Sequence, residues 1–450
     1  MKIKVMKFGG TSVAKPEARM TSAMRVISAK EQGYSPVVVV SAIGRKGAPY
    51  ATDTLLNLLR EIDPNVEPDP RELDMMIACG EIMSAVIFAH TLKTLGHPAQ
   101  AFRGGQAGIR TDGVYGNARI VGINPISLLR SIEQDKIPVV CGFQGVFVLN
   151  EGDPGGELTT LGRGGSDTTG AAIGAALQAD AVEIYTDVDG VKTADPDAVK
   201  EAPTLRKVTY DEVAEIAHLG AKVVHPRAAE IAMNYGIPLW VKSTFTDDEG
   251  TEIVTRETFP GRRVTGVTHT GKLVYLQFDL IHAAEGDRAM LESRIYETMA
   301  KYGISLFMLN LSPSSTGFAV PRSQYPIVEG VLDGLVIPLS GEEKRVYLVQ
   351  IGSKPSRVVE TQASLLSSLG EVCRIPTLLT EGCTMVSLVG HEYMQQPGVF
   401  LDVLSTLVGG QVTVLQTSDS DYSLSCLVPE ADTNRAVKLL HDRFKLAEVS

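Results

Sequence analysis

Short apolar runs alternate with helical patterns through the first half of the chain. Ile3–Phe8 alternates apolar and basic residues, and Pro36–Ala42 is wholly apolar, so both are predicted strands. Between them, residues 16–32 carry apolar side chains at helical spacing. The alternation continues with predicted strands at Ile137–Gly142, Ala181–Thr186 and Pro238–Ser243, and with predicted helices at Leu55–Ile62, Glu72–Leu95, Leu128–Glu133, Thr168–Gln178, Val208–Ala217 and Arg227–Asn234. Continuous apolar strands between helices indicate an α/β fold, with a mainly parallel sheet covered by helices on both faces.

The pattern changes after residue 264 and then repeats. A strand, a helix, a strand, a polar turn and another strand are predicted over Lys272–Phe318. The same order returns over Met385–Val428 and is followed by a helix at Thr433–Phe444. In both copies the polar turn follows the second strand, at Ser312–Gly317 and at Thr417–Asp421. This internal repeat indicates two small α+β units, compatible with ferredoxin-like topology.

A chain of 450 residues is too long for one ordinary core, so two or three domains are expected. We predict a first domain over residues 1–245 and a Gly/Asp/Thr-rich linker over residues 246–263. The first α+β region is predicted over residues 264–380, and the second unit over residues 381–450. Within the first region, a strand at Lys344–Gly352 and a helix at Val358–Leu369 are extra elements without an assigned place.

Composition narrows the class of protein. The formal net charge of -11 argues against a general role on nucleic acid or at a membrane surface. Five scattered Cys residues form no CxxC pair, so neither a zinc site nor a disulfide framework is indicated, and a reducing cytoplasmic setting fits. The N-terminus lacks an apolar signal region, and the valine run at Val37–Val40 is too short to span a bilayer.

The segment Thr159–Pro196 has the pattern of a nucleotide site. Gly162, Gly164 and Gly165 allow positive φ and close approach of a ligand. Ser166 and Asp167 follow as candidate helix caps, and free N–H groups at a helix start attract phosphate. Arg163 adds a planar donor that matches carboxylate or phosphate oxygens. The alternative is a Gly-rich surface turn before an ordinary helix; the acidic loop after the next strand favours the nucleotide site.

Lys7 lies at the C-terminal end of the first predicted strand, just before the Gly9-Gly10 turn. In open α/β sheets ligands bind at that edge, so Lys7 is a candidate phosphate contact; a solvated strand end is the alternative. Neither GxxxxGK[ST] nor GxGxxG occurs in the chain. Glu81 lies in a helical run with apolar neighbours, so it is either an exposed helical carboxylate or a partly buried one.

These motifs resemble those of the aspartokinases, within the amino-acid-kinase fold, and the resemblance covers nearly all of residues 1–245. The stretch IGRKGAPYATDTLL makes the chain similar to the monofunctional, diaminopimelate-sensitive type of Bacillus-like bacteria, and the C-terminal repeat resembles a pair of ACT domains. The matching strings are KFGGTSV from Lys7, VVVVSA ending at Ala42, ATDTLL from Ala51, CGEIMSA from Cys79, GFQG from Gly142, TTLGRGGSDTT from Thr159, YTDVDGV from Tyr185, TADP from Thr193 and GAKVVHPRA from Gly220.

The resemblance implies an activity: ATP and L-aspartate give 4-phospho-L-aspartate and ADP, with Mg²⁺, as the first step of lysine/diaminopimelate, threonine and methionine biosynthesis. It implies that Lys7 stabilises the transferring phosphoryl group and that Asp167 orients Lys7 or the metal shell. Substrate binding is implied for Ser41, Thr52, Asp53, Glu81, Arg163 and Ser166, with Arg163 on an aspartate carboxylate and Glu81 on the ammonium. ATP binding is implied for Lys7, Phe8, Gly9, Gly10, Gly165, Thr186, Asp187, Lys192 and Lys222. No residue is predicted as a metal ligand.

The resemblance also implies feedback control through the ACT units, with lysine, threonine or meso-diaminopimelate as the effector, and a homodimer or larger homo-oligomer. Two features depart from the family. Asp197 stands where the family usually has an Arg that meets ATP phosphates, and the segment Lys344–Cys383 is longer than usual. A sister kinase of the same fold, acting on another acceptor, and a non-catalytic amino-acid sensor are the rival functions.

Overall fold

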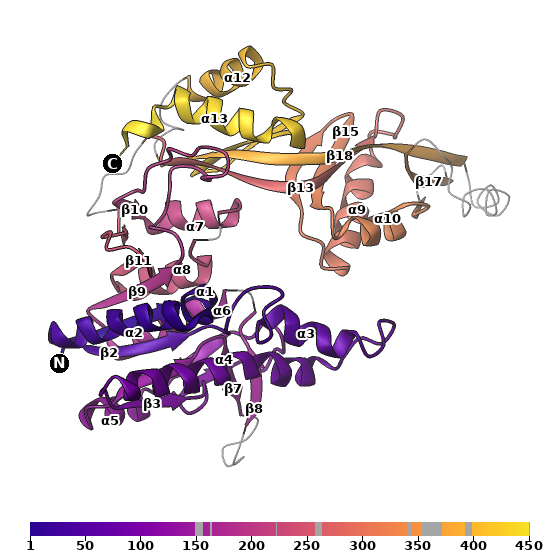
Figure 1. Ribbon diagram of the computed structural model, residues 1–450. Coiled ribbons are helices and arrows are strands. Elements are labelled where there is room, and N and C mark those ends of the chain that lie inside the picture. The colour runs from indigo at the N-terminus through magenta and orange to yellow at the C-terminus, as the bar shows by residue number, and fades with distance from the viewer. Residues whose placement is uncertain are drawn as a thin grey trace.

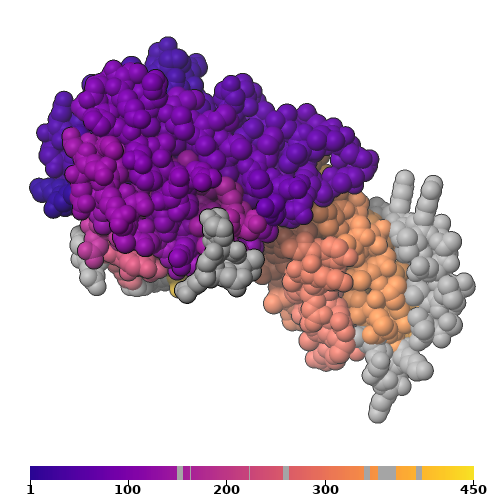
Figure 2. Space-filling view, turned by 90° about the horizontal axis from the view of Figure 1, so that it is seen from below, coloured from indigo at the N-terminus to yellow at the C-terminus, as the bar shows by residue number. Residues whose placement is uncertain are grey.

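The computed structural model describes residues 1–148, 156–162, 164–221, 223–256, 263–340, 344–352, 371–391 and 398–449. Figure 1 shows an N-terminal region that contains a central sheet between helices, and a C-terminal region in which two pairs of helices flank a long sheet. The space-filling view in Figure 2 shows the same division, with the orange part of the C-terminal region projecting as a separate lobe.

An eight-stranded sheet forms the centre of the N-terminal region, in the order β10-β12-β11-β9-β1-β2-β6-β3. The bounds of its strands are β1 Ile3–Phe8, β2 Ser35–Val40, β3 Ala99–Phe102, β6 Ile137–Cys141, β9 Ala181–Thr186, β10 Lys207–Thr209, β11 Leu239–Ser243 and β12 Thr251–Val254. Every neighbouring pair is parallel except β11 with β12. The expectation of a mainly parallel sheet is confirmed.

Helices cover both faces of this sheet because its strands are apolar on both sides. Val37 and Val39 of β2 belong to one core, together with residues of α6, α7 and α8. Val38 and Val40 belong to the opposite core, together with residues of α2 and α4. The helix bounds are α1 Gly10–Ala14, α2 Pro16–Glu31, α3 Thr52–Arg60, α4 Pro70–Thr94, α5 Ile126–Glu133, α6 Gly165–Leu177, α7 Tyr210–His218 and α8 Pro226–Tyr235.

Helix α4 is long and apolar enough, by length and composition, to cross a membrane. Half of its apolar window is buried inside the protein, and Ala85, Phe88 and Ala89 lie in the core beneath β2 and β6. This is the packing of a core helix.

A second, four-stranded sheet lies beside the first, in the order β5-β4-β7-β8. Its strands are β4 Ile109–Thr111, β5 Ile120–Ile123, β7 Gln144–Phe147 and β8 Glu157–Thr160. The sequence predicts only loop-rich structure over residues 104–116, because strands this short carry no clear period.

In the C-terminal region one sheet runs β14-β15-β13-β18-β17-β16, while β20 pairs with β18 and with β19. The bounds are β13 Gly266–Asp279, α9 Arg288–Lys301, β14 Phe307–Ser312, β15 Ser315–Pro321, α10 Tyr325–Leu332, β16 Val336–Ser340, β17 Lys344–Ile351, β18 Glu371–Val389, α12 Val399–Gly409, β19 Gln416–Asp419, β20 Ser423–Pro429 and α13 Thr433–Arg443, with short 3-10 turns at Glu430–Asp432 and Leu446–Glu448.

Strand β13 belongs to both halves of this sheet. Its residues 266–270 pair with residues 385–389 of β18, and its residues 273–279 pair with β15. One core packs α9 and α10 against the second half of β13, and another packs α12 and α13 against the end of β18. The predicted repeat of α+β units is therefore present, with strands shared between the units.

The structure differs from the sequence prediction at several boundaries. The predicted linker over residues 246–263 contains β12, a strand of the first sheet, and the predicted boundary at residue 380 falls inside β18. The predicted helix at Val208–Ala217 begins instead at Tyr210, because Thr209 and Glu212 cap it reciprocally through side chain and backbone. The predicted helix at Val358–Leu369 lies outside the described residues.

Candidate functional site

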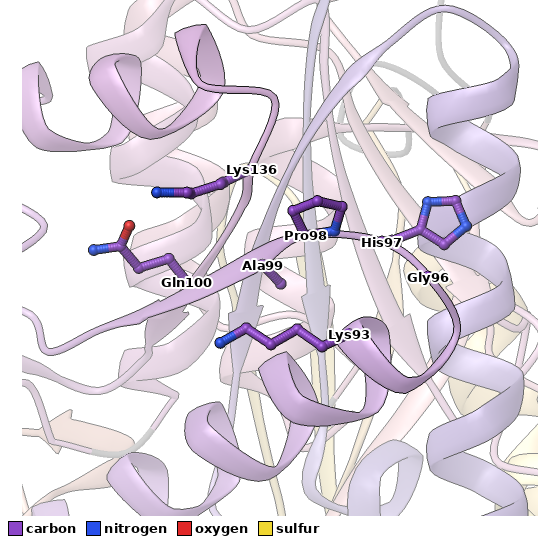
Figure 3. A pocket seen from close by; sticks show the side chains of 7 residues that line it. All are labelled: Lys93, Gly96, His97, Pro98, Ala99, Gln100 and Lys136. Atoms are coloured by element: carbon purple, nitrogen blue, oxygen red, sulfur yellow. The ribbon is translucent and has the colours of Figure 1, made fainter.

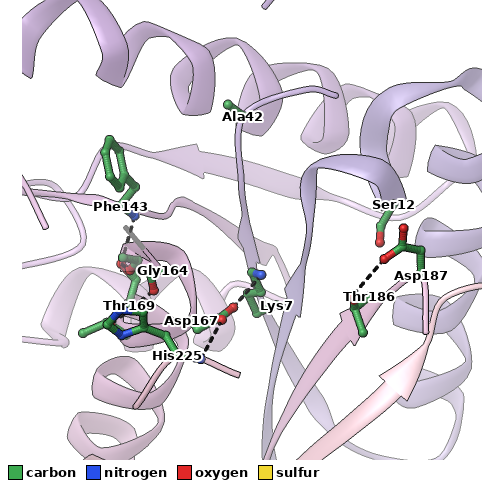
Figure 4. Close-up of polar contacts among 12 residues, drawn as sticks. Lys7, Ser12, Ala42, Phe143, Gly164, Asp167, Thr169, Thr186, Asp187 and His225 are labelled. Carbon is green, nitrogen blue, oxygen red and sulfur yellow. Dashed lines mark hydrogen bonds and ion pairs between the residues drawn. The ribbon is translucent and has the colours of Figure 1, made fainter. Parts of the chain in front are cut away.

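The site is built around an ion pair at the carboxyl edge of the central sheet. Lys7, near the end of β1, is only 8% exposed. Its Nζ atom lies 2.5 Å from Oδ1 of Asp167, in the first turn of α6 (Figure 4). The second carboxylate oxygen, Oδ2, accepts a 3.3 Å hydrogen bond from the backbone N–H of His225. The pair places a cation beside the start of a helix, where phosphate is favoured.

The turn after β1 requires glycine because backbone atoms approach it closely. A Cβ atom on Gly10 would lie 2.4 Å from the carbonyl oxygen of Gly44. Gly9 donates its N–H to the carbonyl of Tyr185 at 3.1 Å, and Phe8, fully buried, accepts from the N–H of Ser41 at 3.1 Å. Gly10 begins α1 rather than an open turn.

The Gly-rich segment before α6 is equally close-packed. Gly164 has φ +69°, and a Cβ atom there would lie 2.1 Å from the ring of His225. Gly165 donates its N–H to the carbonyl of Gly162 at 3.0 Å, so that the predicted phosphate donor is bonded within the segment itself. Ser166 is buried against Gly142. Arg163 lies outside the described residues.

Glu81 is buried in α4 and 2% exposed, which excludes the exposed-carboxylate alternative. Its Oε1 accepts from the N–H of Ala42 at 2.9 Å, while its Oε2 has no hydrogen-bond partner among the described residues. Burial raises the pKa of Glu81 to about 8 despite this backbone hydrogen bond. A cationic group that reached Oε2 would relieve the cost of the buried carboxylate.

Thr52 and Asp53 form the first turn of α3, which packs against α4 next to Glu81. Thr52 is half-buried and Asp53 is exposed. Contact between the helices is close at Gly80, where a Cβ atom would lie 3.4 Å from Leu55. Ser41 follows β2, which α4 contacts, so four of the predicted substrate residues (Ser41, Thr52, Asp53 and Glu81) lie on or next to contacting elements.

A pocket of about 410 Å³ lies on the other side of the site and is lined by three predicted ATP-binding residues, Thr186, Asp187 and Lys192. Lys192 donates to Oγ1 of Thr204 at 3.2 Å, and Asp187 pairs with Arg45 at 2.7 Å. Asp195 and Pro196 also line the pocket, whereas the described lining does not include Asp197, which is exposed. Lys222 lies outside the described residues.

The far wall of this pocket belongs to the C-terminal region. Gly266, Val267 and His269 of β13 line it. Val267 donates its N–H to the carbonyl of Thr193 at 2.7 Å, and the hydroxyl of Thr193 lies 3.0 Å from Nε2 of His441 on α13. The nucleotide-sized pocket is thus shared by both regions.

A second pocket, about 490 Å³ in volume, lies at the start of β3 and at the turn before β6 (Figure 3). This is the opposite edge of the parallel sheet from Lys7. Its lining includes Lys93, His97 and Lys136 and none of the predicted site residues.

Sequence patterns did not identify several residues that contact the site. Asp74, buried in α4, accepts from Thr160 N–H at 2.8 Å, from Thr160 Oγ1 at 2.6 Å and from the N–H of Gly116. His225 and Arg227 contact the Gly-rich segment from α8. The string GAKVVHPRA contains both, but nothing in its spacing reveals what these side chains contact.

Comparison with known proteins shows which families the chain matches. The amino acid kinase family matches residues 2–243, and the ACT domain family matches residues 378–442. Aspartokinase 1 of Bacillus subtilis (strain 168) is 37% identical over 454 residues, covering 100% of both chains. The aspartokinase of Mycolicibacterium smegmatis is 34% identical, covering 99% of this chain and 97% of that protein.

Solved structures share the fold over the whole length. E. coli aspartokinase III in complex with aspartate and ADP superposes with a TM-score of 0.70 at 24% identity, covering 98% of this chain and 99% of that one. The aspartate kinase of Synechocystis superposes with a TM-score of 0.61 at 25% identity, covering 99% of both. With a family match over more than half of its length and a full-length relative at 37% identity, the chain belongs to the amino acid kinase family and, within it, to the aspartokinases.

Proposed function

We propose that the chain is an aspartate kinase, which transfers the γ-phosphoryl group of ATP to the side-chain carboxylate of L-aspartate and so begins lysine/diaminopimelate, threonine and methionine biosynthesis. The observation that carries the proposal is the Lys7–Asp167 pair at the carboxyl edge of the sheet. Strand β1 pairs with β9, whose last residue Thr186 lines the nucleotide-sized pocket, and with β2, after which Ala42 donates to the buried Glu81.

The chemistry requires alignment and charge neutralisation. A carboxylate acceptor is already ionised at pH 7, so no general base is needed. Lys7 stabilises the charge that develops on the transferring phosphoryl group, and Asp167 holds its ammonium in place. The helix start at α6 adds partial positive charge on the same side.

Aspartate binds between α3, α4 and the start of α6. Glu81 Oε2 receives the substrate ammonium, because that oxygen is buried without a partner among the described residues. Arg163 binds a substrate carboxylate, and Ser41, Thr52, Asp53 and Ser166 complete the substrate site. These roles are supported by the family resemblance and, for every residue except Arg163, by the positions of the side chains described above.

ATP binds with its adenosine in the pocket beside Thr186, Asp187 and Lys192, and with its phosphates toward Lys7–Gly10, Gly165 and Lys222. In the described ranges no group of three or more His, Cys, Asp or Glu side chains could hold a metal by itself. Mg²⁺ in kinase sites keeps several waters and binds through substrate phosphates and one or two carboxylates. When bound, Mg²⁺ neutralises charge on the phosphate oxygens.

Residues 1–245 form the catalytic domain, extended by β12, and residues 264–450 carry feedback control. E. coli aspartokinase III has been solved with lysine and aspartate, which supports lysine as the effector here, with threonine and meso-diaminopimelate as the alternatives. The chain acts in the cytoplasm as a homodimer or larger homo-oligomer.

The test is ADP release by the purified chain with ATP and Mg²⁺. L-aspartate should support turnover, and L-glutamate, N-acetylglutamate and UMP should not. Turnover with a glutamate derivative or UMP alone would make the chain a sister kinase of the fold. Amino-acid binding without ADP release from any acceptor would make it a sensor.

A further inference from the structure

The short segment His225-Pro226-Arg227 contacts the Gly-rich segment before α6 through two of its side chains, His225 and Arg227. His225 is the N-cap of α8, and its Nδ1 accepts from the N–H of Arg227 at 3.3 Å. Pro226 occupies the first helical position, where a proline is pre-organised. The start of α8 is therefore held by a capping hydrogen bond and a proline, and it faces Leu161, Gly164 and Asp167.

His225 forms the first contact. Its ring lies so close to Gly164 that any Cβ there would collide with it, and its backbone N–H donates to Oδ2 of Asp167. One carboxylate oxygen of Asp167 therefore accepts a hydrogen bond from His225, and the other forms the ion pair with Lys7. A shift of α8 would move this carboxylate and so change the position of Lys7.

Arg227 forms the second contact. Its Nη1 donates to the carbonyl of Leu161 at 3.2 Å, and its Nη2 donates to Oδ1 of Asn117 at 2.9 Å. Asn117 in turn sits against Gly162, where a Cβ atom would lie 2.9 Å from the same Oδ1. A guanidinium holds two acceptors in a fixed fork, which an ammonium cannot do.

We propose that Arg227 is a positioning residue for phosphoryl transfer: it fixes Leu161 directly and Gly162 through Asn117, ahead of the start of α6, so that Asp167 holds Lys7 in line with the transferring group. The inference rests on the proposed kinase function. It assigns Arg227 an effect on the chemical step, since the described contacts of its guanidinium are made with protein atoms and not in the nucleotide pocket.

The test compares Arg227→Met, which keeps the apolar stem, with Arg227→Lys, which keeps the charge. We expect kcat to fall at least tenfold in Arg227→Met while KM for ATP stays within twofold, and Arg227→Lys to recover only part of the loss. Asn117→Ala should act in the same direction, and its effect should be less than additive with Arg227→Met. Arg206→Met, which removes an exposed arginine paired with Glu249, is the matched control.

Hydrogen exchange provides a readout that does not depend on activity. Peptides covering residues 159–168 should exchange faster in Arg227→Met than in the wild type or in Arg206→Met, with the melting temperature retained. If the wild-type chain does not release ADP in the presence of aspartate, the proposed function is wrong. The exchange experiment still tests separately whether Arg227 fixes the Gly-rich segment. Unchanged kcat and exchange in Arg227→Met and Asn117→Ala, or a rise confined to KM for ATP, would overturn the positioning role.

Discussion

Lys7 Nζ and Asp167 Oδ1 lie 2.5 Å apart, although the first is on β1 and the second begins α6. Both side chains are nearly buried, so each would be costly to keep charged without the other. The contact is possible because β1 lies at the centre of the sheet and α6 packs on it through small side chains such as Gly170, whose added Cβ would be 3.4 Å from Lys7. Removing either partner leaves a buried charge at the site proposed for phosphoryl transfer.

Lys7→Met should lower kcat by roughly 10²–10³-fold, because one preorganised donor to developing charge is lost. Steady-state kinetics with aspartate and ATP measures the effect. Lys4→Met is the control, since Lys4 lies on the same strand but pairs with Glu183. Wild-type turnover in Lys7→Met would refute the role given to Lys7.

Gly164→Ala should reduce kcat at least tenfold, because the added methyl group would collide with the His225 ring and displace the start of α6. Gly236→Ala is the control, because it introduces backbone strain of the same kind without a collision. Gly236 has φ +62° and no atom within 4 Å of an added Cβ, so its alanine variant meets only the strain of about 1–2 kcal/mol. Equal activity in the two variants would show that the contact with His225 is unimportant for catalysis.

Glu81 should make the folded chain less stable as pH rises. Burial raises its pKa to about 8, from an ordinary value of 4.5. Between these values the folded chain holds a proton that the unfolded chain releases, so stability is lost with increasing pH by up to about 1.4 kcal/mol per unit. Relative to Glu81→Gln, the wild-type melting temperature should fall by at least roughly 4 °C between pH 5.5 and pH 8.

Glu72→Gln, in the exposed first turn of the same helix, is the control for this experiment. A wild-type melting temperature that tracks that of Glu81→Gln at every pH would mean that the carboxylate is ionised throughout. Saturating aspartate should shrink the difference, because the ammonium proposed to reach Oε2 favours the ionised form.

Glu215→Ala should weaken inhibition by the effector at least threefold while leaving basal kcat within twofold. Oε1 of Glu215, on α7, accepts from the hydroxyls of Ser420 at 3.1 Å and Ser423 at 2.5 Å, beside the polar turn of the second ACT unit. A coupling of about 1 kcal/mol between the regions corresponds to roughly fivefold in affinity. Inhibition curves with lysine, threonine and meso-diaminopimelate test this, with Glu230→Ala on exposed α8 surface as the control. Unchanged curves would exclude this contact from regulation.

Sequence patterns predicted the elements whose signal is local. The bounds of β9, a short and largely apolar run, are those expected. Helices α2, α4 and α8 differ from expectation by one or two residues, because each has a proline near its start. The strands β4, β5 and β10 have three or four residues, too few to establish a period, and they were not predicted.

The residues of the candidate site divide in the same way, into those with a local sequence signal and those without one. Lys7, Glu81 and Asp167 could be selected because strand end, apolar helix and helix start are visible in the sequence. Arg227, Asn117 and Asp74 could not, since each acts through partners that only the folded chain brings near. The roles of the selected residues remain predictions for the experiments above.

The double membership of β13 limits how this protein can be cut. A fragment that begins at residue 381 lacks residues 266–270, which border β18 in its own half of the sheet, and would expose an unpaired hydrophobic edge. A fragment that ends at residue 256 leaves the Thr193 carbonyl without the N–H of Val267. Any truncation or domain exchange must therefore keep or replace residues 264–449 as a single unit.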